Sequence, residues 1–284
     1  HPVPDKERLR AGSRLLEFVS TLPRDAHLLL LVSGGASALV EAPTAGLMLA
    51  DLVAENSRLL AAGLDIAAMN TRRRELSQGK GGGLLAAFPG ARVTVLAISD
   101  VEGDSLGVIG SGIGLVPEAA AYAHDTRIVG SNANARAAVA RAAKAEGLTV
   151  LSSEETLYTD VHAAADAVAT GLDGAHGLRI RGGAPTVVLP ENPGEGGRNQ
   201  ALALALARHI EGRAGLTARE AGTDGSDGPT SAAGGLVDGT TWSAEAPEYL
   251  ERADAGTFLD QRGALFTTGP TGTNVMDLAL ILQR

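Results

Sequence analysis

Glycine-rich segments carrying hydroxyl, carboxylate or basic side chains are the parts of this sequence that could do chemistry. Residues 33–37 (SGGAS) supply two hydroxyls and several backbone N–H groups just before an expected helix, an arrangement that favours a phosphate or a carboxylate. A tight turn that needs small residues is the alternative interpretation. A hydrolase nucleophile elbow is disfavoured, because Leu39 stands where that motif needs glycine.

Lys80 is a cation within a run of glycines, residues 79–83 (GKGGG), where a polyanion can approach the backbone. The segment is not a Walker loop, because Arg74 stands where that motif begins with glycine and Gly81 stands where it requires Ser or Thr. The basic run 72–74 is more typical of a solvated helix face than of an anion clamp.

Two acidic residues, Asp100 and Asp104, flank a short loop that follows an expected strand. They could ligate Mg²⁺, which takes one or two carboxylates together with substrate phosphates. An Asp/Gly turn explains the same two residues equally well. The sequence therefore leaves both interpretations open.

Asp224 and Asp227 lie in a second acidic loop, residues 222–230 (GTDGSDGPT). The loop resembles a calcium-binding loop, but that pattern needs a Glu at its twelfth position, where Gly235 stands. A carboxylate in a rigid glycine loop can instead orient a substrate hydroxyl and accept its proton during phosphoryl transfer.

Arg198 lies in residues 196–200 (GGRNQ), at the expected start of a helix, where a guanidinium and the helix dipole together favour an oxyanion. An exposed arginine at a helix start is the alternative. Residues 110–115 (GSGIGL) nearly form a dinucleotide fingerprint, but Leu115 stands where the third glycine is required, which disfavours nicotinamide binding. No two of the six histidines have metal-ligand spacing.

Composition restricts the class of protein that must position these groups. The 284 residues are 44% hydrophobic and 20% charged, with no apolar run near the ~18 residues of a membrane helix, so we expect a globular protein that is not embedded in a membrane. The absence of cysteine excludes disulfides and thiolate chemistry and suits a cytoplasmic location. A net charge of −9, with only four Phe, three Tyr and one Trp, disfavours nucleic acid as a partner.

Apolar runs of strand length, each followed by a polar glycine-rich loop, predict the first domain. The expected strands are residues 26–32, 92–98 and 127–129. Helices are expected at residues 5–20 and in the alanine-rich segment that ends at Gly147. Strands buried on both faces and alternating with helices indicate a mostly parallel sheet, in which ligands bind beyond the carboxyl ends of the strands.

The rest of the chain reads as a second α/β domain. Residues 160–170 predict a helix, and residues 171–174 resemble a linker, so we place the boundary between residues 174 and 175. The elements expected beyond it are strands at 186–189 and 264–268, a helix at 199–211, and a last helix after the loop 269–274.

Nine segments in chain order carry a resemblance to a known family. They are residues 1–5 (HPVPD), 33–39 (SGGASAL), 69–86 (MNTRRRELSQGKGGGLLA), 98–104 (ISDVEGD), 109–112 (IGSG), 129–135 (VGSNANA), 196–205 (GGRNQALALA), 221–234 (AGTDGSDGPTSAAG) and 267–278 (TTGPTGTNVMDL). Together they resemble the glycerate 2-kinase family, whose C-terminal half is the MOFRL domain. The resemblance covers the whole chain.

The resemblance implies a Rossmann-like, mostly parallel domain at residues 1–174 and a smaller α/β MOFRL domain at residues 175–284. It also implies ATP-dependent phosphorylation of D-glycerate to 2-phosphoglycerate, with Mg²⁺, in a cleft between the domains. The expected partners are thus a sugar acid and a nucleotide, and a homodimer is left open.

The resemblance further assigns roles to residues. Arg198 and Asp224 look like the catalytic pair, with Arg198 countering charge and Asp224 activating the hydroxyl. Asp100 and Asp104 stay the candidate metal ligands on the ground given above, their place in the loop after an expected strand. The residues that look like substrate and nucleotide contacts are Ser33, Gly34, Gly35, Ala36, Ser37, Lys80, Ser99, Asp100, Ser111, Gly112, Asn132, Asn199, Thr223, Gly269, Thr271, Thr273 and Asn274.

The chain departs from the family pattern in four places. Family members begin further upstream, in a part that holds a lysine expected to act in catalysis. Ala184 replaces a family Glu, Ile113 and Gly114 replace Pro-Thr, and residues 216–220 (LTARE) replace an apolar strand. Two alternatives stay open. One is a hydroxypyruvate reductase that uses NAD(P)H, a name that some family members carry. The other, favoured by Ala184 and the upstream part, is a catalytically impaired homologue that binds a nucleotide or a sugar acid.

Overall fold

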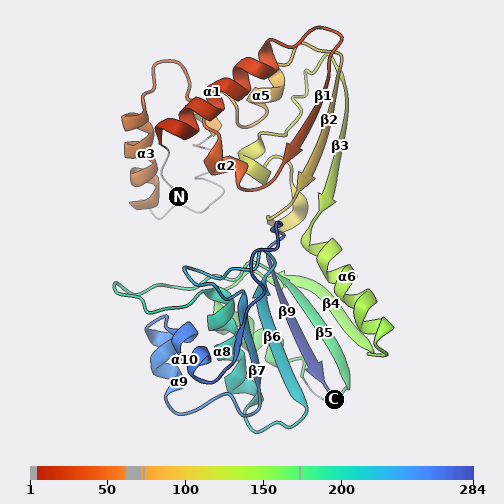
Figure 1. Cartoon of the computed structure of the whole chain (residues 1–284), viewed down its shortest axis with the longest axis vertical. Coiled ribbons are helices and arrows are strands. Elements are labelled where there is room, and N and C mark those ends of the chain that lie inside the picture. Colours follow the sequence, from red (N-terminus) through yellow and green to blue (C-terminus); the bar gives the residue numbers. More distant parts are fainter. Residues whose placement is uncertain (1–4, 62–71, 73, 173) are drawn as a thin grey trace. The chain divides into compact units, whose positions relative to one another are not determined.

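The chain forms two compact units, His1–Ser131 and Asn132–Arg284, in a computed structural model that describes residues 5–61, 72, 74–172 and 174–284 (Figure 1). The division between the units lies upstream of the expected one at residues 174 and 175. The reason is that the strand at residues 150–157 belongs to the second sheet and the helix at residues 132–145 packs against that sheet. Parts of two resemblance segments, residues 1–4 and residues 69–71 with 73, lie outside the described residues.

The first unit is built on the expected parallel sheet. Its strands are β1 (His27–Val32), β2 (Arg92–Ile98) and β3 (Ala123–Gly130), and they lie side by side in chain order. The described helices are α1 (Lys6–Ser20), α2 (Ala36–Leu39), α3 (Leu49–Ala61) and α5 (Gly83–Ala86), with short 3₁₀ turns η1 (Glu102–Asp104) and η2 (Ile109–Gly112). The three expected strands are confirmed.

A capping residue fixes the start of the first helix. Helix α1 begins after Asp5, whose side chain accepts a hydrogen bond from the backbone N–H of Arg8 at 2.9 Å and so caps the helix. The expectation of strands buried on both faces is wrong for β1, because Leu29 and Leu31 are 57% and 70% exposed. Only the alternate residues of β1, such as Leu28 and Val32, pack into the core of this unit.

The second unit is a six-stranded mixed sheet in the order β4-β5-β9-β6-β7-β8. Its strands are β4 (Val150–Leu157), β5 (Gly177–Gly183), β6 (Leu216–Gly222), β7 (Gly234–Asp238), β8 (Leu265–Phe266) and β9 (Asp277–Gln283). Its helices are α6 (Asn132–Ala145), α7 (Val161–Ala169), α8 (Arg198–Ile210), α9 (Ala246–Glu251) and α10 (Ala255–Gln261). The β4–β5 pair is parallel, whereas the remaining neighbours pair antiparallel.

Four expectations about this unit differ from the structure. The strand lies at Gly177–Gly183 instead of at 186–189, where only Thr186 makes an isolated bridge. The expected last helix is strand β9, and the expected strand 264–268 shortens to the two residues of β8. The proposed linker 171–174, of which residue 173 lies outside the described residues, falls inside this unit.

Strand β9 is apolar on both faces, so the spacing of its apolar residues does not distinguish a strand from a helix. Ala279 and Ile281 pack into the core with α7 and α8, whereas Leu280 and Leu282 pack with α6 on the opposite face. A continuous apolar run of this kind has neither a helical nor a strand period. The antiparallel pairing of β9 with both β5 and β6 decides the outcome.

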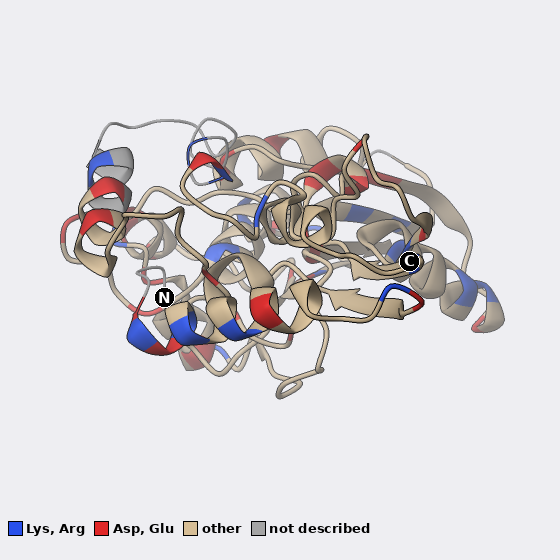
Figure 2. Cartoon of the chain, turned by 90° about the horizontal axis from the view of Figure 1, so that it is seen from above, with Lys and Arg blue, Asp and Glu red and all other residues tan. Residues whose placement is uncertain are grey.

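Acidic and basic residues are interspersed over the chain (Figure 2), which carries a net charge of −9. Among the described residues, no helix is both long enough and apolar enough to cross a membrane.

Candidate functional site

Four loops of the first unit meet beyond the carboxyl ends of its strands, as a parallel sheet requires. A Cβ atom placed on Gly34 would lie 1.7 Å from Asp100 Oδ2, so the loops after β1 and β2 are in close contact. The backbone N–H of Gly81 donates to the carbonyl of Ser111 at 3.0 Å, and that of Gly82 to the carbonyl of Gly112 at 2.9 Å. The segments that the sequence offered separately therefore form one cluster within this unit.

Asp100 is held between these loops. Its Oδ1 atom is buried and has no hydrogen-bond partner among the described residues, and burial raises the pKa of this carboxyl. An unpartnered carboxylate oxygen is a donor that Mg²⁺ accepts, so the chemistry of Asp100 fits that ion. Within the described part of the chain, no group of three or more His, Cys, Asp or Glu side chains could by itself hold a metal ion.

Lys80 is buried, and its ammonium group forms an ion pair with Glu41. No sequence motif marks Glu41 for this role, because it lies 39 positions from Lys80 in the chain. A buried lysine needs a partner of this kind, because an isolated ammonium in the core is costly. Lys80 therefore neutralises a carboxylate in this structure, and its contact with a ligand stays a prediction.

Backbone strain marks the same cluster. Ser111 and Asp104 have positive φ values of 60° and 52°, which residues with a side chain rarely adopt. At Ser111 the strained turn lets the loop carbonyls accept from the Gly81 and Gly82 N–H groups. Ser99, which is fully buried, donates its hydroxyl to the carbonyl of Val101 at 3.3 Å.

The close approach of Gly34 to Asp100 gives a testable prediction. Gly34→Ala is expected to destabilise the first unit by about 1–3 kcal/mol, because the new methyl group must displace the Asp100 carboxylate. Gly35→Ala is the matched control, since its Cβ would have no neighbour nearer than Leu39 at 3.8 Å and its backbone is already helical. Hydrogen exchange of amides in β1 and β2 measures the effect, and equal protection in the two variants would contradict it.

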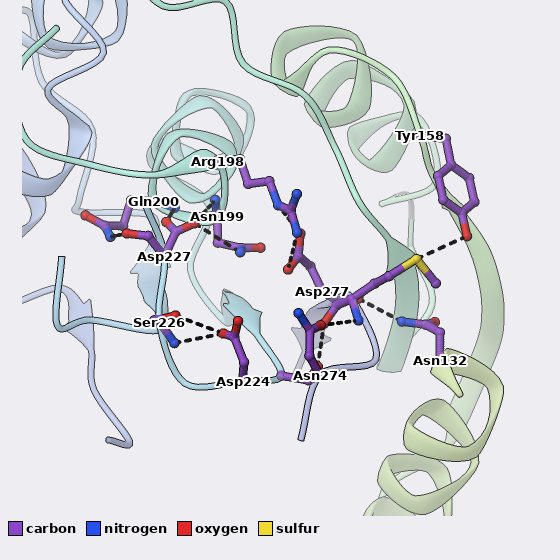
Figure 3. A network of polar contacts seen from close by, with 12 residues as sticks. Asn132, Tyr158, Arg198, Asn199, Gln200, Asp224, Ser226, Asp227, Asn274 and Asp277 are labelled. Atoms are coloured by element: carbon purple, nitrogen blue, oxygen red, sulfur yellow. Dashed lines mark hydrogen bonds and ion pairs between the residues drawn. The ribbon is translucent and has the colours of Figure 1, made fainter. Parts of the chain in front are cut away.

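In the second unit, Arg198 and Asp277 form the centre of a polar network (Figure 3). Arg198 is the first residue of α8, and Asp277 is the first residue of β9. The guanidinium approaches both carboxylate oxygens, with Nε 2.6 Å from Oδ2 and the second contact 3.1 Å from Oδ1. The Asp277 side chain is 4% exposed and that of Arg198 is 40% exposed, so a buried carboxylate holds a cation that still reaches solvent.

Asp227 caps the start of α8. Its carboxylate accepts hydrogen bonds from the backbone N–H groups of Asn199 at 3.0 Å and Gln200 at 2.8 Å, and from the Asn199 side chain at 3.2 Å. Burial raises the pKa of Asp227 to about 6, although the two backbone N–H groups act in the opposite direction. The second acid of the 222–230 loop is thus a helix cap and not part of a calcium site.

Asp224 lies in the same loop and is half-buried. Its Oδ1 atom accepts from the backbone N–H of Ser226 at 2.9 Å and from the Ser226 hydroxyl at 3.2 Å, which fixes the direction of the carboxylate (Figure 3). Burial is the main cause that raises the pKa of Asp277, and the negative charge of Asp224 adds to it, so Asp224 lies close enough to act on this carboxyl.

Thr223 fastens this loop to the segment before β9. Its hydroxyl donates to the Met276 carbonyl at 2.6 Å and accepts from the Val275 N–H at 2.8 Å, while Thr271 donates to the Thr223 carbonyl at 2.6 Å. Met276 has a positive φ of 67°, and the Asn274 side chain accepts from its N–H at 2.9 Å. These hydrogen bonds and the positive φ of Met276 fix the backbone just before β9 and so place Asp277 next to Arg198.

Several residues that were predicted to contact a ligand make hydrogen bonds to other groups of the protein instead. Asn132 is fully buried and donates to the carbonyls of Val275 at 3.0 Å and Asp277 at 3.1 Å. Asn199, Thr223 and Thr271 make the contacts described above. Gly269, with φ of 70°, and Thr273, which is exposed, belong to the loop 269–274 that precedes β9.

The structure therefore brings the predicted residues together within each unit. Ser33, Lys80 and Asp100 belong to the first unit, and Arg198 and Asp224 to the second. One pocket shared by all of them stays a prediction. Asp277 was missed as a site residue, although it is the only charged side chain in the resemblance segment 267–278 and so could have been found.

The raised pKa of Asp227 predicts a pH dependence of stability. Because its folded pKa of about 6 exceeds the unfolded value of 3.8, the wild type loses stability as pH rises through that window. We expect the free energy of unfolding of Asp227→Asn, relative to that of the wild type, to rise by about 2 kcal/mol between pH 4 and pH 7, whatever the difference at pH 4. Urea denaturation at both pH values tests this, with exposed Asp260→Asn as control; a pH-independent difference between Asp227→Asn and the wild type would contradict it.

Comparisons with known proteins agree with this architecture. Residues 1–145 match a family model described as a domain of unknown function, DUF4147, and residues 177–277 match the MOFRL family. A D-glycerate 2-kinase from Thermotoga maritima is 36% identical over 99% of this chain and 78% of its own length. A putative hydroxypyruvate reductase from Agrobacterium vitis is 33% identical over 99% of this chain and 86% of its own length.

A solved structure supports the same relationship. The crystal structure of glycerate kinase from Thermotoga maritima matches all of this chain and 79% of its own, with 33% identity and a TM-score of 0.88. The alignment with the Thermotoga D-glycerate 2-kinase spans 325 positions, more than the 284 residues of this chain, so that relative carries internal insertions.

Proposed function

The chain belongs to the glycerate 2-kinase family, and on that premise we propose that it transfers the γ-phosphoryl group of ATP to the 2-hydroxyl of D-glycerate. The observation that carries the proposal is the Arg198–Asp277 pair with Asp224 beside it. Phosphoryl transfer needs positioned cations and a group that orients the attacking hydroxyl, and this network contains both.

In the proposed step, the 2-hydroxyl oxygen attacks the γ-phosphorus while the bond to the β–γ bridging oxygen breaks, and ADP leaves. Asp224, oriented by Ser226, accepts the hydroxyl proton. Arg198 stabilises the charge that develops on the transferring group. Asp277 binds one edge of the guanidinium through both carboxylate oxygens, so the orientation of the Arg198 side chain is set before the substrate binds.

For the nucleotide, we propose the loop cluster of the first unit. Gly34 and Gly35, just after β1, allow a phosphate to approach the backbone closely. The 79–83 loop supports this site through its backbone, because Gly81 and Gly82 donate their N–H groups to the Ser111 and Gly112 carbonyls. Asp100 would hold Mg²⁺ through its unpartnered oxygen. When bound, the ion supplies charge neutralisation to the phosphates. Asp104 as a second ligand remains part of this proposal.

A hydroxypyruvate reductase activity is the competing proposal, suggested by the name of the Agrobacterium relative. The turn Ile109–Gly112 is a short 3₁₀ segment with left-handed residues and not the start of a long helix after a strand. A dinucleotide fingerprint needs that strand-turn-helix context, so the geometry favours the kinase.

One assay separates the reaction classes. The full chain is given D-glycerate, ATP and Mg²⁺ in a coupled ADP-release assay, and separately hydroxypyruvate with NADH or NADPH. We expect ADP release that depends on glycerate and no oxidation of the reduced nicotinamide. Nicotinamide oxidation without ADP release would support the reductase, and binding of ATP by calorimetry without turnover would support a binding homologue.

A further inference from the structure

Glu220, in the middle of β6, is a buried acidic residue for which the proposed mechanism has no use. It is fully buried, and neither carboxyl oxygen has a hydrogen-bond partner among the described residues. A buried carboxylate without a partner is among the most costly groups in a protein core. The groups that surround Glu220 must therefore explain how the fold tolerates this buried carboxyl group.

The register of the sheet places Glu220 under α8. Gly222 follows on the same face of β6, and a Cβ there would lie 3.5 Å from the Asn199 amide nitrogen. Across the sheet Glu220 pairs with Gly235, whose Cβ would lie 2.8 Å from that of Ala203. Glu220 therefore points into the layer between the sheet and the first turns of α8.

Asp277 is a diagonal neighbour of Glu220 on that face. Gly222 pairs with Asp277, and Glu220 pairs with Ala279, two residues further along β9. Asp277 from β9 is a charged group close enough to act on Glu220, and Asp277 is itself bound to Arg198 from α8. On β6 and β7 the other residues of this face are apolar or glycine.

These surroundings favour the neutral acid. Burial, and then the negative charge of Asp277, raise the pKa of Glu220 well above its usual value. A protonated carboxyl group has one O–H to donate. Two nearby acceptors lack a well-aligned donor: Asn199 Oδ1, and Asp277 Oδ2, which meets Arg198 as an ion pair.

We propose that Glu220 is a positioning residue: it remains protonated, donates its proton toward Asp277, and so keeps Asp277 in the orientation that grips Arg198. The kinetic consequence rests on the proposed kinase function, whereas the protonation and the contact with Asp277 do not. Glu220 does not touch substrate, and it acts only through Asp277.

The kinetic test compares Glu220→Gln, which keeps a hydrogen-bond donor, with Glu220→Leu, which fills the space without one. We expect kcat for glycerate phosphorylation to fall about tenfold in Glu220→Leu with little change in KM, and to stay within about threefold in Glu220→Gln. Exposed Glu251→Gln, in the same unit, is the control for the chemical change. Equal kcat in the Leu and Gln variants would overturn the positioning role.

Two measurements test the proposal without activity. Infrared spectroscopy of the wild type at neutral pH should show a protonated carboxyl band that is missing in Glu220→Gln, and its absence from the wild type would overturn the proposal. In a double-mutant cycle of Glu220→Leu and Asp277→Asn, the unfolding constants should deviate from additivity by about threefold or more. Additive effects would overturn the contact. A wild type without kinase activity would refute the proposed function. The infrared band and the double-mutant cycle would still test the protonation of Glu220 and its contact with Asp277.

Discussion

Asp224→Asn is expected to lower kcat by about 10²- to 10⁴-fold and to leave the fold intact, since a positioned general base contributes a factor of that size. The amide of the variant can still accept from Ser226, so the loop keeps its geometry. It cannot accept the proton of the attacking hydroxyl. The initial rate of ADP release at saturating glycerate and ATP is the measurement.

The matched control for this prediction is Asp260→Asn, which makes the same chemical change at an exposed position of the second unit. Its kcat should equal that of the wild type. If Asp224→Asn turned over as fast as Asp260→Asn, the role of Asp224 as base would be refuted. Circular dichroism and thermal unfolding of both variants check that neither has lost structure.

Arg198→Lys is the second large effect, with kcat expected to fall about 10²- to 10³-fold, as on removal of one donor to a developing oxyanion. A lysine ammonium is a point charge and cannot reproduce the planar fork that meets both oxygens of Asp277 while a further edge faces outward. The side chain would also leave the buried Asp277 carboxylate incompletely paired.

Arg208→Lys is the control for this substitution, because Arg208 is exposed in the last turn of the same helix α8. We expect its kinetics and its stability to match the wild type. Steady-state kcat for the two variants at saturating substrates makes the comparison. A kcat for Arg198→Lys within a factor of two of the Arg208→Lys value would show that the guanidinium fork is not needed.

Local signals predicted much of the first unit and of α8. The apolar run 92–98 became β2 without change, and the glycine-rich loops after β1 and β2 do come together through Gly34 and Asp100. These features follow from short-range periodicity and from the rule that ligand loops lie at the carboxyl edge of a parallel sheet. The start of α8 was predicted to within one residue.

Features that depend on contacts distant in sequence were not predictable in the same way. Glu41 neutralises Lys80 across 39 positions, and Asp277 grips Arg198 across 79. The role of β9 as a central strand depends on its pairing with β5 and β6, because its residues are apolar on both faces. The capping role of Asp227 likewise appears only when the loop folds back onto α8.

Asp224 and Arg198 are proposed to serve the transfer of a phosphoryl group to the 2-hydroxyl of glycerate. Phosphorus NMR of the products formed from ATP and D-glycerate tests it directly. The wild type should give an ester at carbon 2, and that signal should appear at least 100-fold more slowly with Asp224→Asn. An ester at carbon 3, or free phosphate without any ester, would contradict the proposed reaction.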